Sequence, residues 1–149
     1  MVQAVILMCP LAWQVSSFAE FMRDIAGRHA ARFSMRDDEL QVIRDQRDSY
    51  WRIAIYGSSD RTGWIREYAT NPDLDERFRL EVYALRPFIV NFNDLAVTRQ
   101  LVIAVAREIV ERGETAWMDT DYGWVIHVRE LLQSCERNLR WDWRGSAPG

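Results

Sequence analysis

The spacing of hydrophobic residues changes twice along this chain, and that change constrains the fold more than any other feature of the sequence. Between residues 18 and 29, apolar side chains recur every three or four positions, as they do on one face of an α-helix. From residue 31 to residue 56 they alternate with polar side chains, as in half-buried β-strands. From residue 95 the helical spacing returns. A run of strands flanked by helices is typical of an α+β fold with a mainly antiparallel sheet.

The N-terminal half predicts one buried strand, one helix and a strand meander. The aliphatic run from Val2 to Met8, closed by Pro10, predicts a strand that is buried on both faces. Ser16 and Ser17 offer a capping hydroxyl to the helix that follows. We expect the meander to consist of strands over residues 31–35, 40–43 and 50–56, followed by a loop over residues 57–63.

The C-terminal half predicts two more strands, a long helix, a hairpin and a last helix. Residues 77–85 alternate, with Phe78 and Val82 on one side, and therefore predict a strand before a second short strand at residues 88–92. The long helix is expected to begin after an N-cap at Asn93 and to end at Gly113. We expect the hairpin at residues 116–119 and 124–128, with the last helix following it.

These elements fit one domain, because 149 residues leave little room for a second. We predict a single α+β domain over residues 1–140, in which about three helices pack on the sheet as a single pair of layers. The tail at residues 141–149 has no hydrophobic period, and we expect it to fray. The alternative for its tryptophans, Trp141 and Trp143, is that the tail folds back over the core.

Charge and cysteine content exclude several classes of protein. The 19 basic residues are all arginine and are mixed with 22 acidic residues, which gives a formal net charge of −3. No basic tail is present to neutralise phosphates, so we expect no nucleic-acid partner. No apolar run is long enough to span a membrane, and we do not expect the protein to bind a membrane. Cys9 and Cys135 stand apart from each other and from any metal-binding spacing, which suits a cytoplasmic protein without a cofactor or metal.

Catalytic signatures are missing, and the remaining candidate groups have simpler interpretations. The sequence contains no phosphate-binding loop, nucleophile elbow or zinc-protease motif. His127 lies eight residues from both Asp119 and Cys135, a spacing that would suit a nucleophilic site. However, Cys135 falls on the apolar stripe of the last helix, and a thiol buried there is inert. His29 ends another apolar stripe and is expected to be packed.

The richest polar segment is the turn between the last two strands. Asp119 and Asp121 alternate with Thr120 and Tyr122, and Trp124 follows the glycine. Such a turn offers carboxylate acceptors and aromatic surface to an arginine or lysine of a partner, or ligands to a cation. The alternative is a purely structural turn, in which the aspartates cap local amides and Gly123 supplies a positive φ.

Arginine-flanked tryptophans provide a second, weaker set of candidates. Trp64, Trp141 and Trp143 lie beside arginines in a loop and in the tail, where exposed indoles stack on bases, sugars or partner side chains. The alternative is that they cover the core.

The segment from Ala116 through Trp117-Met118-Asp119-Thr120-Asp121-Tyr122-Gly123-Trp124 to Leu132 resembles the C-terminal part of small bacterial immunity proteins of polymorphic toxin systems. These systems include contact-dependent inhibition and type VI secretion. In such proteins a long helix leads to a similar Asp-Tyr-Gly block and then to a short helix. The resemblance covers the last third of the chain. It implies a non-enzymatic protein that binds and neutralises one cognate toxin in the cytoplasm.

On this basis the predicted function is that of a toxin-binding immunity protein, with Asp119, Asp121, Tyr122 and Trp124 as the partner-binding residues. Glu114 is a weaker neighbour. The alternative function is a small-molecule enzyme or ligand-binding domain with a pocket near His127 and Asp119.

Overall fold

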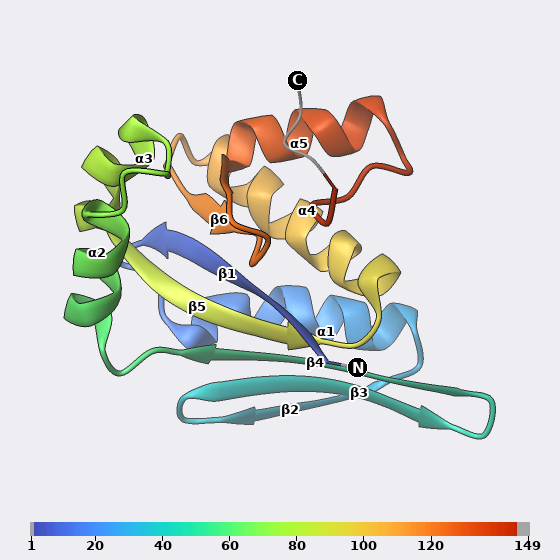
Figure 1. Cartoon of the computed structure of the whole chain (residues 1–149). Coiled ribbons are helices and arrows are strands. Elements are labelled where there is room, and N and C mark those ends of the chain that lie inside the picture. Colours follow the sequence, from blue (N-terminus) through green and yellow to red (C-terminus); the bar gives the residue numbers. More distant parts are fainter. Residues whose placement is uncertain (1, 146–149) are drawn as a thin grey trace.

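A computed structural model describes residues 2–145 of the chain, and in that range it forms one antiparallel sheet with helices on both faces (Figure 1). The strands are β1 (Gln3–Pro10), β2 (Arg32–Arg36), β3 (Glu39–Gln46), β4 (Ser49–Gly57), β5 (Leu85–Phe92), β6 (Trp117–Asp119) and β7 (Val125–His127). The helices are α1 (Ala19–Arg28), α2 (Arg61–Ala69), α3 (Glu76–Glu81), α4 (Leu95–Glu111) and α5 (Val128–Arg137). Two short 3₁₀ segments, Val15–Phe18 and Val82–Ala84, precede α1 and β5. The predicted α+β class is therefore confirmed.

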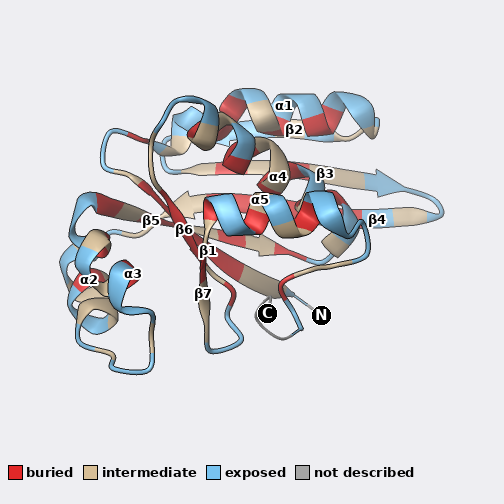
Figure 2. Ribbon diagram, turned by 90° about the horizontal axis from the view of Figure 1, so that it is seen from above, coloured by how far each residue is buried: buried red, intermediate tan, exposed pale blue. Residues whose placement is uncertain are grey.

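The sheet is ordered β2-β3-β4-β5-β1-β6-β7, and each neighbouring pair is antiparallel. β1 lies between β5 and β6, so both of its edges are paired, and helices cover both of its faces (Figure 2). Val5, Leu7 and Cys9 belong to the core under α1, α4 and α5. Ile6 and Met8 point the other way, into a smaller core under α2 and α3. The prediction of a first strand buried on both faces is correct.

The helix count and the layering differ from the prediction. The described chain has five helices rather than three, and α2 and α3 cover the face of β1 opposite to α4. The expected strand at residues 77–85 is instead α3 and a 3₁₀ turn. Asp75 caps α3, since its carboxylate accepts hydrogen bonds from the backbone N–H groups of Arg77 and Phe78. The prediction of a single pair of layers is therefore wrong where α2 and α3 cover the second face of the sheet.

The expected loop at residues 57–63 also contains the start of a helix. Asp60 is the N-cap of α2, and its Oδ1 accepts a hydrogen bond from the N–H of Gly63 at 2.9 Å. A Cβ atom at position 63 would stand 2.3 Å from Asp60 Oδ2. With a Cβ at this position the Asp60 carboxylate would have to shift, so Gly63 belongs to the cap rather than to a flexible loop.

The N-cap of α4 is one residue later than expected. Asp94, not Asn93, accepts the hydrogen bond from the N–H of Val97. The Asn93 side chain instead accepts a hydrogen bond from the N–H of Arg52 at 2.8 Å, which joins this corner to β4. At the other end of α4, Gly113 has a φ of 69° and supplies the left-handed residue predicted there.

The described part of the tail packs on the core. The Trp143 side chain is fully buried and lies edge-on to Phe92. Arg99 of α4 donates to the backbone oxygens of Cys135, Asn138 and Trp141, which ties the tail to the end of α5. The tail therefore covers the core as far as Trp143, in place of the fraying that we expected, and residues 146–149 lie outside the described residues.

We predict that Trp143→Ala lowers the free energy of unfolding by about 3–5 kcal/mol, because it removes a large buried ring. Urea denaturation followed by circular dichroism measures this loss. Leu139→Ala is the matched control, since Leu139 is 81% exposed and its truncation should change stability by less than about 0.5 kcal/mol. A loss below about 1 kcal/mol for Trp143→Ala would contradict the packing of the tail.

Candidate functional site

The Asp-rich turn is ordered by its own hydrogen bonds. Asp119 Oδ1 accepts a hydrogen bond from the N–H of Asp121 at 2.9 Å, and the Thr120 hydroxyl donates to the backbone oxygen of Trp124 at 2.8 Å. Asp121 and Gly123 both have positive φ, at 66° and 87°. Aspartate tolerates this conformation better than most residues, and glycine tolerates it without strain. The structural interpretation of the turn is thus correct for Asp119 and Gly123, while Asp121 leaves its carboxylate exposed.

The turn also forms one wall of a pocket of about 260 Å³. The opposite wall is α2, which contributes Glu67 and Tyr68. Asn71, Leu74 and Gly123 complete the lining, together with Asp119, Asp121 and Trp124. Three carboxylates and two aromatic side chains therefore face one cavity, and none of the residues that line it is basic.

Tyr68 links the two walls. Its hydroxyl donates a hydrogen bond to Asp119 Oδ2 at 2.7 Å. Burial raises the pKa of Tyr68, and the negative charges of Asp119, Glu67 and Asp121 raise it further. The tyrosine is thus neutral at physiological pH and remains a donor. With three carboxylates and no basic residue in its lining, the pocket has a negative potential.

The predicted site residues fall into two groups. Asp119, Asp121 and Trp124 line the pocket, whereas Tyr122 is 51% exposed and does not. Glu114 lies before β6 and does not line it either. Glu67 and Tyr68 were missed, because residues 61–69 show no clear helical spacing of apolar side chains. The nearest available signal was Asp60 three residues before Gly63, a spacing compatible with a helix cap.

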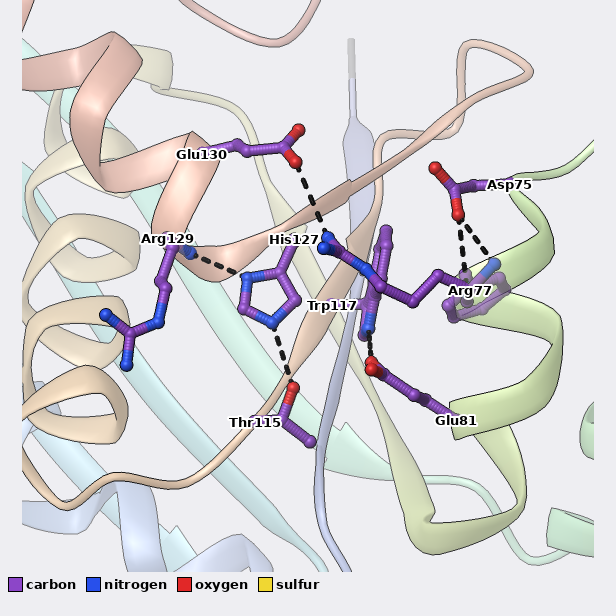
Figure 3. A network of polar contacts seen from close by, with 9 residues as sticks. Asp75, Arg77, Glu81, Thr115, Trp117, His127, Arg129 and Glu130 are labelled. Carbon is purple, nitrogen blue, oxygen red and sulfur yellow. Dashed lines mark hydrogen bonds and ion pairs between the residues drawn. The ribbon is translucent and has the colours of Figure 1, made fainter.

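His127 has a structural role in the hairpin (Figure 3). Its Nδ1 accepts a hydrogen bond from the N–H of Arg129 at 3.1 Å and caps α5. Since Nδ1 is an acceptor, the neutral ring carries its proton on Nε2, which lies 2.9 Å from the Thr115 hydroxyl oxygen. Burial lowers the pKa of His127, and the Arg77 guanidinium contributes to the decrease. Both ring nitrogens are therefore engaged within the fold.

Trp117 contacts several of the residues around His127 (Figure 3). Its indole N–H donates to Glu81 Oε2 at 2.6 Å, and the His127 ring lies edge-on to it. The Arg77 guanidinium stacks 4.9 Å from the centre of the Trp117 ring and lies 3.5 Å from a carboxylate oxygen of Glu130. These contacts join α3 to the hairpin and to α5.

Neither cysteine is placed for catalysis. Cys9 and Cys135 are both buried, and burial raises the pKa of each thiol. Thiolates are therefore disfavoured at both positions. Within residues 2–145, no group of three or more histidine, cysteine or acidic side chains is arranged to hold a metal ion. No helix in the same range is long and apolar enough to cross a bilayer.

The tryptophans considered for stacking are engaged in packing. Trp143 is buried, and Trp141 and Trp64 are half-buried against the two cores. The ring of Trp64 lies 6.1 Å from that of Tyr68, between centroids. Trp143 is therefore not available to stack on a base. Trp64 and Trp141 use part of their ring surface to pack on the cores and do not join it in one platform.

Comparison of the chain with protein-family models, with curated proteins and with solved structures found no match. A function is therefore argued from this chain alone, that is, from the geometry of its described residues and from its sequence.

We predict that the capping role of His127 makes stability fall in mild acid. Folding lowers the pKa of His127, so the contribution of the neutral ring is complete above the ordinary value of 6.5 and is lost as pH falls through the folded-state pKa. His127→Asn keeps a capping acceptor that does not titrate. Urea unfolding at about pH 7.5 and about pH 5 should therefore show a larger loss for the natural protein than for His127→Asn. Equal losses would contradict this role.

Proposed function

We propose that the chain is a non-enzymatic binding protein, and most concretely an immunity protein that binds and neutralises a cognate toxin. The observation that carries this proposal is the pocket between α2 and the Asp-rich turn. It is lined by three carboxylates and two aromatic side chains and by no basic residue. We infer that it receives an arginine or lysine side chain of the partner.

The carboxylates of the pocket are not neutralised by the chain itself. Within residues 2–145, Glu67, Asp119 and Asp121 take part in no ion pair. A guanidinium that enters the pocket would find acceptors on two sides and aromatic faces for stacking. Because the turn is already ordered by its own hydrogen bonds, binding would cost little conformational entropy.

The arrangement of His127 and Asp119 favours binding over the alternative of a small-molecule enzyme. Both nitrogens of His127 are engaged by Thr115 and Arg129. Both oxygens of Asp119 accept hydrogen bonds from Tyr68 and Asp121. A general acid or base must exchange a proton with a substrate, and His127 has no free nitrogen for it in this arrangement. Asp119 keeps lone pairs that can still accept a hydrogen bond from a bound cation.

The assignment of the partner as a toxin rests on the resemblance of the last third of the chain to immunity proteins. The net charge of −3 agrees with a basic partner, because opposite charges speed association. Occlusion of the toxin's own site would then neutralise it without any chemistry by this chain.

We predict that Glu67→Gln combined with Asp121→Asn weakens the complex with the toxin about 10- to 100-fold, since it removes two of the three charges that face the bound cation. The candidate toxin to test is the product of the neighbouring gene. Growth rescue on co-expression and calorimetric titration of the purified proteins measure the effect.

The matched control is Glu20→Gln combined with Glu111→Gln, which removes the same charge from exposed positions on α1 and α4. Both double variants should unfold within about 0.5 kcal/mol of the natural protein. If the neighbouring product is not toxic, or is toxic and neither rescued nor bound, the proposed function fails. If it binds equally well to both variants, the pocket is not the binding site.

A further inference from the structure

The opposite edge of the sheet carries a second surface, unrelated to the acidic pocket. β2 is the edge strand and pairs with β3 only (Figure 1). Its five residues are exposed or half-buried, and none is proline. An edge strand of this kind presents unpaired backbone N–H and C=O groups to any extended chain that approaches it.

The turn between β2 and β3 decides which backbone groups are free. Arg36 pairs with Glu39 across the two-residue turn Asp37-Asp38. The two residues that flank such a turn form backbone hydrogen bonds with each other. Along an antiparallel ladder, hydrogen-bonded and non-hydrogen-bonded pairs then alternate. The N–H and C=O groups of Phe33 and Met35 therefore point away from β3, toward solvent.

The side chains of β2 sort by face. Arg32, Ser34 and Arg36 share the face that lies opposite to α1, since their partners in β3 alternate with the buried Leu40 and Val42. Phe33 and Met35 point to the α1 side, where Met35 is 52% exposed. The apolar layer under α1 thus continues to the edge of the sheet and stops there without a cover.

Two arginines of this edge strand, Arg32 and Arg36, are unpaired in the part of the chain that the structure describes. Within the described residues, Arg32 and Arg36 form no ion pair or side-chain hydrogen bond. Arg23 of α1 has no carboxylate partner either, and its guanidinium lies 5.0 Å from the centre of the Phe33 ring. The acidic residues of this corner are Asp37 and Asp38 of the turn and Glu39, which lies opposite Arg36 and pairs with Arg52, so they offset the arginine charge near the turn.

The same arginines disfavour pairing with a second copy of the chain. In a symmetric antiparallel pair centred on Ser34, each Arg32 would stand opposite an Arg36 of the other copy. Like charges that face each other across strands are destabilising. In that register the arginines oppose self-association, whereas a strand of opposite charge would meet attraction at the same positions.

We propose that β2 binds an extended acidic segment of a partner protein, which adds to the sheet as an eighth, antiparallel strand. The segment would place carboxylates opposite Arg36 and Arg32, four positions apart, and apolar side chains opposite Phe33 and Met35. Main-chain hydrogen bonds supply the attachment, while the alternating side chains supply selectivity. This surface does not depend on the proposed toxin-binding function, since it shares no residue with the acidic pocket.

The test uses two synthetic peptides, capped at both ends, with the core sequences Glu-Val-Thr-Val-Glu and Lys-Val-Thr-Val-Lys. We expect the acidic peptide to bind at least about fivefold more tightly than the basic one, given attraction at two cross-strand positions in the first and repulsion in the second. Amide hydrogen exchange by NMR should slow at Phe33 and Met35 when the acidic peptide is added.

Three variants separate the parts of the proposal. Arg32→Glu with Arg36→Glu should reverse the preference between the peptides. Arg129→Glu with Arg140→Glu changes the net charge equally at exposed sites elsewhere and should leave it unchanged. Met35→Pro removes an outward N–H from an edge strand, so the fold should persist while peptide binding is lost.

Equal binding of the two peptides, binding of neither, or protection at residues outside β2 would each overturn the proposal. Concentration-dependent self-association with protection at Phe33 and Met35 would also overturn it, since the occupant would then be a second copy of the chain.

Discussion

The burial of β1 on both faces is the constraint on which the rest of the structure depends. Alternate residues of this strand enter two different cores, with Leu7 under α4 and α5 and Met8 under α2 and α3. Such a strand has no solvent face, so helices must pack on both sides of the sheet at this point. β6 pairs with β1 through Ile6 and Asp119, which fixes where the Asp-rich turn leaves the sheet. The pairing of β6 with the apolar strand β1 therefore determines the position of the candidate site.

The smaller of the two cores gives the candidate site its second wall. Rings in this core contact one another in series from Trp64 through Tyr68, Phe78 and Trp117 to His127, with centroids 5.1–6.1 Å apart. Edge-on and tilted ring pairs stabilise beyond the apolar area that they bury. The series joins α2 and α3 to the final hairpin, although Tyr68 and Asp119 are 51 residues apart in sequence. The packing of the core therefore sets the positions of both walls of the pocket.

The sequence predicts the fold correctly where a periodic pattern of apolar residues runs over a long segment. It fails where the segment is short. The strands of the meander and the helix over Leu95–Glu111 follow from their spacing. Residues 77–85 fit two periods at once, because Phe78 and Val82 are separated by four positions and both are buried, while Leu80 between them is 71% exposed. Helical spacing explains the exposure of Leu80 and strand spacing does not. Only one wall of the site is predictable from the sequence. Asp119 and Asp121 lie on a hairpin that the spacing indicates, whereas Glu67 and Tyr68 lie on a helix that it does not indicate.

The net charge of the chain conceals two separate sites, an acidic pocket and a pair of arginines that are unpaired within the described residues. The acidic pocket belongs to the β6–β7 end of the sheet and the unpaired arginines belong to β2 at the other edge. Six steps between neighbouring strands, each of about 4.8 Å, place these ends about 29 Å apart. That span is comparable to the width of a small domain, so a single short peptide cannot reach both surfaces. One partner that engages both must be a folded domain with a basic side chain and an exposed acidic strand on the same side. Otherwise the two surfaces serve different partners, and binding at one would be independent of binding at the other.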